Sequence, residues 1–264
     1  MKPPIFQDSW SEEVRRVYEH DMREMWDTSI APHIHTQYQY LLDFYFSLVP
    51  DDQVLDILDV GCAQATLAML LAERGHRVAA VDIRPEFLEY AASRYTRGDL
   101  RFIAGNLFED NLLTDTFDVV FANQIIEHVL EPQQKIERIA VFLKPGGRLV
   151  MTTPNGAYFR NDLPLHRQFI ARGMAFEENT ADADGHVFAF ALEELVEQVS
   201  LAGLLVDAAG WLETPFVNGH MKFRYLMRVL PVSVGKALDF IALRLPWLKS
   251  RLAHQMYVIA RKAR

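Results

Sequence analysis

Hydrophobic residues follow two different patterns along the chain, and the pattern changes near residue 54. Before that point, apolar positions recur about once per helical turn over residues 11–26 and again over 35–48. The second run ends at Pro50, which is followed by two aspartates. The sequence therefore predicts an N-terminal helical lid over residues 1–50.

Beyond residue 54, short and continuous apolar runs alternate with helical stretches. Strands are expected at 54–60, 77–82, 100–104, 117–122, 148–152, 204–212 and 255–261. Helices are expected between them at 66–74, 85–94, 132–143 and 192–202. Continuous apolar strands separated by helices are typical of a parallel sheet that is covered on both faces. The predicted class is thus a three-layer α/β fold.

Two irregular segments interrupt this alternation. Residues 155–190 are polar and loop-rich, and residues 218–252 are basic. Long insertions in a compact domain are usually functional, so both are predicted to lie on the substrate side of one domain spanning 51–264. A turn is also expected at residues 144–147 (KPGG), between a helix and the next strand.

Composition narrows the setting in which the protein works. The chain has 264 residues and a single cysteine, Cys62, which cannot form an internal disulfide and favours a reducing compartment. A membrane-spanning helix needs about 20 mostly apolar residues, and the longest run without charged residues, 28–42, is shorter and partly polar. The expected location is therefore cytoplasmic.

Charge is distributed unevenly. Residues 218–264 hold ten Lys and Arg against one acid, a net charge of +9, which leaves −17 on the rest because the whole chain carries −8. The acidic remainder argues against nucleic-acid binding. Within the basic segment, residues 223–230 and 238–245 show amphipathic spacing. Two interpretations stay open: a lid that packs its apolar faces on the sheet, or peripheral contact of 218–252 with an anionic membrane or a lipid-linked acceptor.

The segment 54–66 (VLDILDVGCAQAT) is where a ligand site is expected, because a strand runs into a turn of small residues and then a helix. The helix N-terminus offers unpaired N–H groups to an anion. A second strand ends at Asp82, which suits a ribose diol. The second and third glycines of the dinucleotide fingerprint are missing, with Ala63 at the second position, which weakens a dinucleotide interpretation.

These motifs and those that follow them resemble, as an ordered set over residues 54–154, the class I S-adenosylmethionine-dependent methyltransferases. The set comprises DVGCA at 59–63, Asp82, GNL at 105–107, FDVVFANQ at 117–124, EHV at 127–129 and LKPGGRLV at 143–150. The resemblance implies a Rossmann-like, seven-stranded and mostly parallel sheet whose last strand is antiparallel. It also implies S-adenosylmethionine as cofactor and S-adenosylhomocysteine as product.

The resemblance further implies where the cofactor lies. The turn formed by Asp59, Gly61, Cys62 and Ala63 would hold the methionine moiety, and Asp82 the ribose; adenine would lie near Ile83, Asn106 and Leu107, and the sulfonium near Asn123 and Gln124. Two positions depart from the family. Ala63 replaces a glycine, which is tolerable if its φ is negative. Asn106 replaces an aspartate and would offer its amide oxygen to the exocyclic amine.

Three histidines are candidates for chemistry. His128, in the Glu127–His128 pair, could supply a general base or join a divalent cation site, but Gln124 stands where quinone-biosynthesis O-methyltransferases carry another acid, so no metal site is predicted. His166 and His186 bracket the first insertion, and either could accept a proton from the acceptor. A purely structural role is the alternative for all three.

The predicted function is methyl transfer from S-adenosylmethionine to a small-molecule or saccharide-like acceptor, with oxygen favoured as the atom methylated. One alternative is a nicotinamide-dependent dehydrogenase, which the missing glycines and the lack of a Tyr-x-x-x-Lys constellation disfavour. Another is a catalytically inactive protein that binds the cofactor and interacts with a partner.

Overall fold

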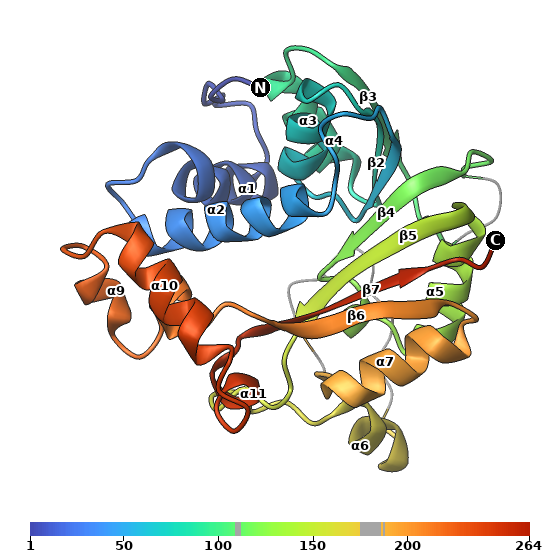
Figure 1. Cartoon of the computed structure of the whole chain (residues 1–264). Helices are drawn as coiled ribbons and strands as arrows, with labels where there is room; N and C mark the ends of the chain where they lie inside the picture. The colour runs from blue at the N-terminus through green and yellow to red at the C-terminus, as the bar shows by residue number, and fades with distance from the viewer. Residues whose placement is uncertain (109–111, 175–185, 187) are drawn as a thin grey trace.

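A computed structural model describes residues 1–108, 112–174, 186 and 188–264, and shows one seven-stranded sheet (Figure 1). Its strands are β1 (Asp56–Val60), β2 (Arg77–Asp82), β3 (Asp99–Ala104), β4 (Phe117–Asn123), β5 (Leu143–Pro154), β6 (Leu205–Leu212) and β7 (Gln255–Arg261). The order is β3-β2-β1-β4-β5-β7-β6, and β7 runs antiparallel to both of its neighbours. The predicted mostly parallel sheet with an antiparallel last strand is confirmed.

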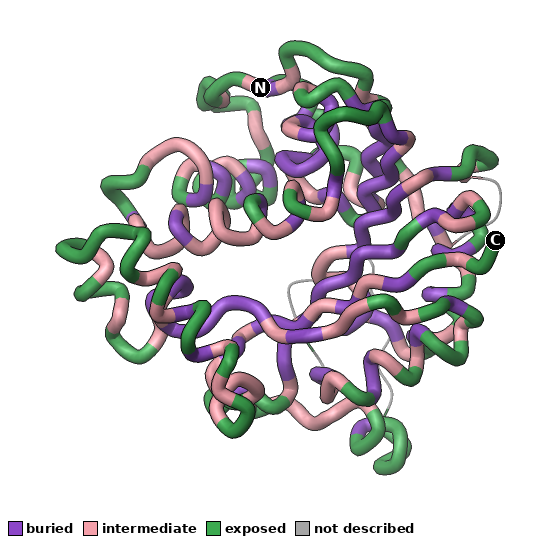
Figure 2. The backbone as a smooth tube through the Cα atoms, in the orientation of Figure 1, coloured by how far each residue is buried: buried purple, intermediate pink, exposed green. Residues whose placement is uncertain are grey.

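Helices cover both faces of the sheet, which confirms the three-layer prediction. Successive side chains of β1, β2 and β4 point alternately into two hydrophobic clusters. One cluster includes residues of α5 (Pro132–Val141) and α7 (Leu192–Leu201). The other includes residues of α2 (Pro32–Ser47), α3 (Thr66–Glu73) and α4 (Pro85–Arg94). The strands between them are buried on both sides, as their continuous apolar sequences require (Figure 2).

The N-terminal helices are attached to the domain by a buried ion pair. The first predicted helix is α1 (Glu12–Asp21), continued by one π-helical turn, η1 (Met22–Trp26). At its end the Asp21 carboxylate lies 2.6 Å from the Arg94 guanidinium, and neither side chain is exposed to solvent. Tyr90 and Trp26 also donate hydrogen bonds to Asp21. Arg94 in turn donates to the carbonyl of Gln64, in the loop after β1.

The first insertion contains α6 (His166–Ala171) and returns to the end of β5 through a single β-bridge between Asn155 and Phe190, while a second bridge joins Leu165 and Ala189 within the insertion. Residues 175–185 and 187 of this insertion lie outside the described residues. The turn predicted at 144–147 is part of β5 instead, where it forms an irregularity: Gly146 has φ +78°, and the register with β4 shifts.

The second insertion forms what we call the C-terminal lobe, residues 215–252. It contains α8 (Pro215–Asn218), α9 (Phe223–Leu226), α10 (Val232–Ala242) and α11 (Lys249–Leu252). The lobe packs against α2 rather than on the sheet (Figure 1), through a 2.7 Å hydrogen bond from Tyr40 to Asp239 and a 2.6 Å ion pair between Lys236 and Asp43. The first interpretation of this segment placed its apolar faces on the sheet. That placement is wrong, because the lobe packs on α2.

The buried pair makes a prediction about stability. Arg94→Ala leaves the Asp21 carboxylate buried without its cation, so we expect the free energy of unfolding to fall by about 3–5 kcal/mol. Arg101→Ala breaks a half-exposed pair with Asp115 and should cost less than about 1 kcal/mol. Urea denaturation of both variants provides the measurement, and equal losses would contradict the role assigned to Asp21–Arg94.

Candidate active site

A cavity of about 590 Å³ opens at the carboxyl ends of β1, β2 and β4. The strand order changes direction between β1 and β4, and such a switch point is where open α/β sheets bind ligands. All ten residues predicted to bind the cofactor line this one cavity: Asp59, Gly61, Cys62, Ala63, Asp82, Ile83, Asn106, Leu107, Asn123 and Gln124. The fold therefore brings together residues from four separate segments of the chain.

The turn after β1 adopts an unusual backbone conformation. Gly61 has φ +63°, and a Cβ atom there would lie 2.8 Å from the Ile125 side chain. Ala63 and Ala65 also have positive φ, at +46° and +53°. The condition under which Ala63 would be tolerable, a negative φ, is therefore not met, because the chain takes the left-handed conformation at this point as it turns into α3. An alanine in that conformation costs about 1–2 kcal/mol.

The Asp82 carboxylate holds this strained turn in place. Its Oδ2 accepts a 2.8 Å hydrogen bond from the Ala63 N–H, and its Oδ1 accepts bonds of 3.0 and 3.2 Å from the backbone N–H and the Nε of Arg84. Each carboxylate oxygen has two lone pairs, so Oδ1 is fully used and one acceptor site remains on Oδ2. Asp82 thus joins the ends of β1 and β2 as well as lining the site.

Asp59 lies beneath the same turn and is almost fully buried. Its burial, and to a lesser extent the nearby Asp82 carboxylate, raise the pKa of Asp59 to about 7. Burial likewise raises the pKa of the Cys62 thiol, so Cys62 is an inert small residue of the turn rather than a nucleophile.

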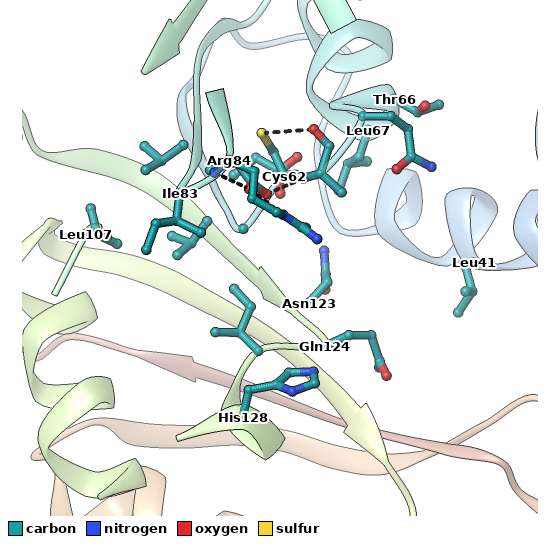
Figure 3. Close-up of a pocket in the computed structure, with 18 of the residues that line it drawn as sticks. Leu41, Cys62, Thr66, Leu67, Ile83, Arg84, Leu107, Asn123, Gln124 and His128 are labelled. Atoms are coloured by element: carbon teal, nitrogen blue, oxygen red, sulfur yellow. Dashed lines mark hydrogen bonds and ion pairs between the residues drawn. The ribbon is translucent and has the colours of Figure 1, made fainter. Parts of the chain in front are cut away.

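The opposite wall of the cavity is formed by amides at the end of β4 (Figure 3). The Asn123 Oδ1 accepts a 3.2 Å hydrogen bond from Thr152, and the Gln124 Nε2 donates a 3.1 Å bond to the Gln255 side chain. Figure 3 shows Asn123, Gln124 and His128 facing the same space as Ile83 and Arg84. Near the predicted adenine position, the Asn106 Oδ1 already accepts the Phe108 N–H at 3.0 Å, which leaves one lone pair for an adenine amine.

Two of the three candidate histidines meet beside this wall. His128 lines the cavity. The centroid of the His186 ring lies 5.0 Å from the centroid of the His128 ring. Glu127 is fully buried, and its Oε2 accepts a 2.9 Å hydrogen bond from Thr153. Its Oε1 accepts no hydrogen bond from the described residues and lies 3.8 Å from the His186 Nε2. Ligand atoms of Glu127, His128 and His186 lie within 4.8 Å of one another. These three side chains could hold a divalent cation, although the sequence predicts no metal site.

His166 is separate from that group. Its Nε2 lies 3.2 Å from the Leu130 carbonyl, and its ring stacks on Phe190 at 5.1 Å. It does not line the cavity. The geometry therefore favours the structural alternative for His166 and keeps His128 and His186 as candidates.

Comparison with known proteins shows what the central part of the chain is similar to. Residues 58–151 match the family model described as "Methyltransferase domain". An uncharacterised methyltransferase of Mycobacterium tuberculosis is 32% identical over 119 residues, which cover 45% of this chain and 60% of that protein. The mitochondrial ubiquinone biosynthesis O-methyltransferase of Schizosaccharomyces pombe is 36% identical over 102 residues, which cover 37% of each chain. The chain therefore carries a methyltransferase domain over residues 58–151, and it spans about 60% of the length of the mycobacterial relative.

Solved structures share the methyltransferase fold over most of the chain. Magnesium protoporphyrin IX methyltransferase from Synechocystis, crystallised with bound SAH, aligns with a TM-score of 0.60 at 14% identity, over 93% of this chain and 94% of that one. An S-adenosylmethionine-dependent methyltransferase from Mesorhizobium loti gives 0.56 at 16% identity, over 86% and 98%. At these identities the likeness concerns the fold alone.

The sequence did not reveal how much the N-terminal helices contribute to the methyltransferase site. Glu24, Gln37, Tyr38 and Leu41 line the cavity. Glu24 accepts a 2.8 Å hydrogen bond from Gln64, and burial raises the pKa of the Tyr38 hydroxyl. No motif marks these residues, because they reach the cavity only through the packing of α1 and α2 over the carboxyl edge of the sheet.

The raised pKa of Asp59 has a measurable consequence for stability. A free aspartate ionises near pH 4, so Asp59 is protonated in the folded protein and ionised in the unfolded chain between about pH 4 and 7. The contribution of Asp59 to the free energy of unfolding is fully present below about pH 4 and is lost as the pH rises through about 7. Asp59→Asn, which cannot ionise, should therefore show a shallower decline of the free energy of unfolding over this range. Parallel pH profiles of variant and wild type would contradict the assignment.

Proposed function

We propose that this methyltransferase transfers the methyl group of S-adenosylmethionine to a hydroxyl oxygen of a small-molecule acceptor. The observation that carries the proposal is the single cavity that combines all ten predicted cofactor residues with the His128 side chain on its opposite wall. At about 590 Å³ the cavity is within the usual range for sites that bind a small molecule or cofactor.

The chemistry requires little of the protein beyond placement. The sulfonium already activates the methyl group, so the site must hold an acceptor oxygen in line with the sulfur–methyl bond at about 3 Å. As the oxygen–methyl bond forms and the sulfur–methyl bond breaks, the hydroxyl proton has to leave. In this proposal His128 accepts it as general base. His186 supports that role, because burial lowers the pKa of its imidazole. The ring beside His128 therefore stays uncharged.

Amide side chains suggest what the acceptor offers. Gln37, Gln124 and Gln255 line the cavity, and each amide can both donate and accept hydrogen bonds. Such groups suit a hydroxyl-rich, saccharide-like acceptor. The likeness to ubiquinone biosynthesis O-methyltransferases supports methylation at oxygen. We further propose a cytoplasmic location, since the single cysteine, Cys62, favours a reducing compartment.

The first test concerns the ribose contact. Asp82→Ala removes the carboxylate proposed to hold the ribose, so calorimetry should show S-adenosylmethionine binding weakened by about 2–4 kcal/mol. Because Asp82 also accepts the Ala63 N–H, the variant should lose a further ~1 kcal/mol of folding stability. The surface variant Asp115→Ala serves as control.

Unchanged S-adenosylmethionine affinity in a folded Asp82→Ala variant would contradict the assignment of the cofactor site to this cavity. Titration of the wild type with NAD in the same instrument distinguishes a dehydrogenase, for which NAD rather than S-adenosylmethionine would bind.

The second test concerns proton transfer. His128→Ala should lower kcat by about 10²–10⁴-fold with cofactor affinity unchanged, whereas His166→Ala, whose ring lies outside the cavity, should retain activity. Methyl transfer to a panel of hydroxylated small molecules supplies the rates. A wild type that binds S-adenosylmethionine but methylates nothing in a cell extract would favour the inactive binding protein.

The same assay separates a base from a metal site. Loss of activity with a chelator, and its return with a divalent cation, would assign Glu127, His128 and His186 to metal binding. Activity that is indifferent to the chelator leaves His128 as the base.

A further inference from the structure

The C-terminal lobe exposes apolar side chains to an unusual degree. Of the twenty large hydrophobic residues that are exposed in the described part of the chain, ten lie between residues 221 and 247. They are Met221, Tyr225, Leu226, Val229, Leu230, Val232, Val234, Phe240, Ile241 and Trp247. Two of these, Val229 and Trp247, are 77% and 73% exposed. Concentrated apolar exposure of this kind marks an interaction surface.

Helix α10 shows how this surface arises. Its inner side places Leu238, Asp239 and Ala242 toward the rest of the protein, and Asp239 and Ala242 are buried. Its outer side, at one-turn spacing, carries Ala237, Phe240 and Ile241, followed by Arg244 just after the helix, and all four are exposed. A helix that is apolar on its solvent side as well as its core side lacks the polar face of an ordinary surface helix. The predicted amphipathic face was therefore only partly correct, since Ile241 points outward.

All charged side chains at the surface of the lobe are positive. Seven Lys and Arg lie between residues 215 and 252, at 222, 224, 228, 236, 244, 249 and 251, against one acid, Asp239. Asp239 is buried, where it accepts hydrogen bonds from Tyr40 and from the Thr214 N–H. The exposed surface of the lobe is thus apolar and basic without any acid. The Arg244 guanidinium lies 3.3 Å from the Phe240 ring centroid, a pairing of cation and aromatic ring suited to an interface between water and lipid.

We propose that the outer surface of the C-terminal lobe, centred on α9, α10 and Trp247, docks the protein onto an anionic membrane surface. Apolar side chains would enter the headgroup region while the arginines and lysines contact anionic headgroups. A second copy of the same surface is a poorer partner, because a symmetric contact would bring the two basic faces together. No described helix is long and apolar enough to cross a membrane, so the contact is peripheral.

Docking would also orient the cavity. Tyr40 and Asp43, which bind the lobe, lie on α2, and the same helix lines the cavity with Ile34, Gln37 and Leu41. The membrane surface and the cavity wall are therefore held on one packed unit (Figure 1). Only this orientation rests on the proposed methyl transfer; docking itself does not require it.

The experiment is co-sedimentation of the full chain with phosphatidylcholine vesicles, with and without phosphatidylglycerol. We expect binding to the anionic vesicles at low salt, weak binding to the neutral ones, and release at about 0.5 M salt. Each basic residue near the surface contributes about fivefold to partitioning, so Arg224→Glu/Arg228→Glu should lose at least about 25-fold. Val229→Ser/Trp247→Ser tests the apolar part and should also weaken binding.

A matched control carries the same charge change elsewhere. Arg97→Glu/Arg148→Glu alters two exposed arginines outside the lobe and should bind anionic vesicles nearly as the wild type does. S-adenosylmethionine affinity, measured on every variant, should be unchanged, so failure of the cofactor assignment is distinguishable from failure of docking.

Three results would overturn the proposal. One is absence of wild-type binding to anionic vesicles at low salt. Another is equal loss of binding in the lobe and control variants. The third is a self-associated protein in sedimentation velocity that the Val229→Ser/Trp247→Ser variant converts to monomer without any effect of vesicles, which would assign the surface to a second copy.

Discussion

The position of β1 between β2 and β4 is the constraint on which the rest of the structure depends. Parallel strands end at the same edge of a sheet, so the turns after β1, β2 and β4 must meet there. The chain leaves β1 toward β2 on one side, while β4 and β5 continue on the other. The connections diverge at this point, and the cavity occupies the space between them.

The turn that borders the cavity illustrates how local strain is maintained by tertiary contacts. Two alanines and one glycine take left-handed conformations within five residues, and the Asp82 carboxylate stabilises this backbone from the neighbouring strand. Asp59 and Asp82 also place two buried carboxyl groups beside the proposed position of a cationic cofactor. Without a ligand, burial favours the neutral form of Asp59, whereas a bound sulfonium and ammonium would favour its ionised form.

Buried polar contacts, rather than apolar packing alone, join the three parts of the molecule. Asp21 and Arg94 attach the N-terminal helices to α4 and the loop after β1, and Tyr40 and Asp239 attach α2 to the C-terminal lobe. Such contacts are directional and leave a costly unpaired group if they break. They give α2 a fixed position between the cavity and the lobe, so that the proposed membrane surface and the proposed methyl-transfer site share one wall.

The sequence by itself determined the strands, the core helices, the sheet type and the ten residues that line one side of the cavity. These features follow from short-range patterns, since apolar runs specify buried strands and small residues with acids at strand ends specify the turns. Only the tertiary structure decided the rest. The positive φ of Ala63, the meeting of His128 with His186, the outward face of α10 and the contribution of α2 to the cavity all depend on residues far apart in the chain. A local sequence pattern does not identify such partners. A helix with two apolar faces can bury either one, and the role of a histidine depends on the residues that folding places beside it.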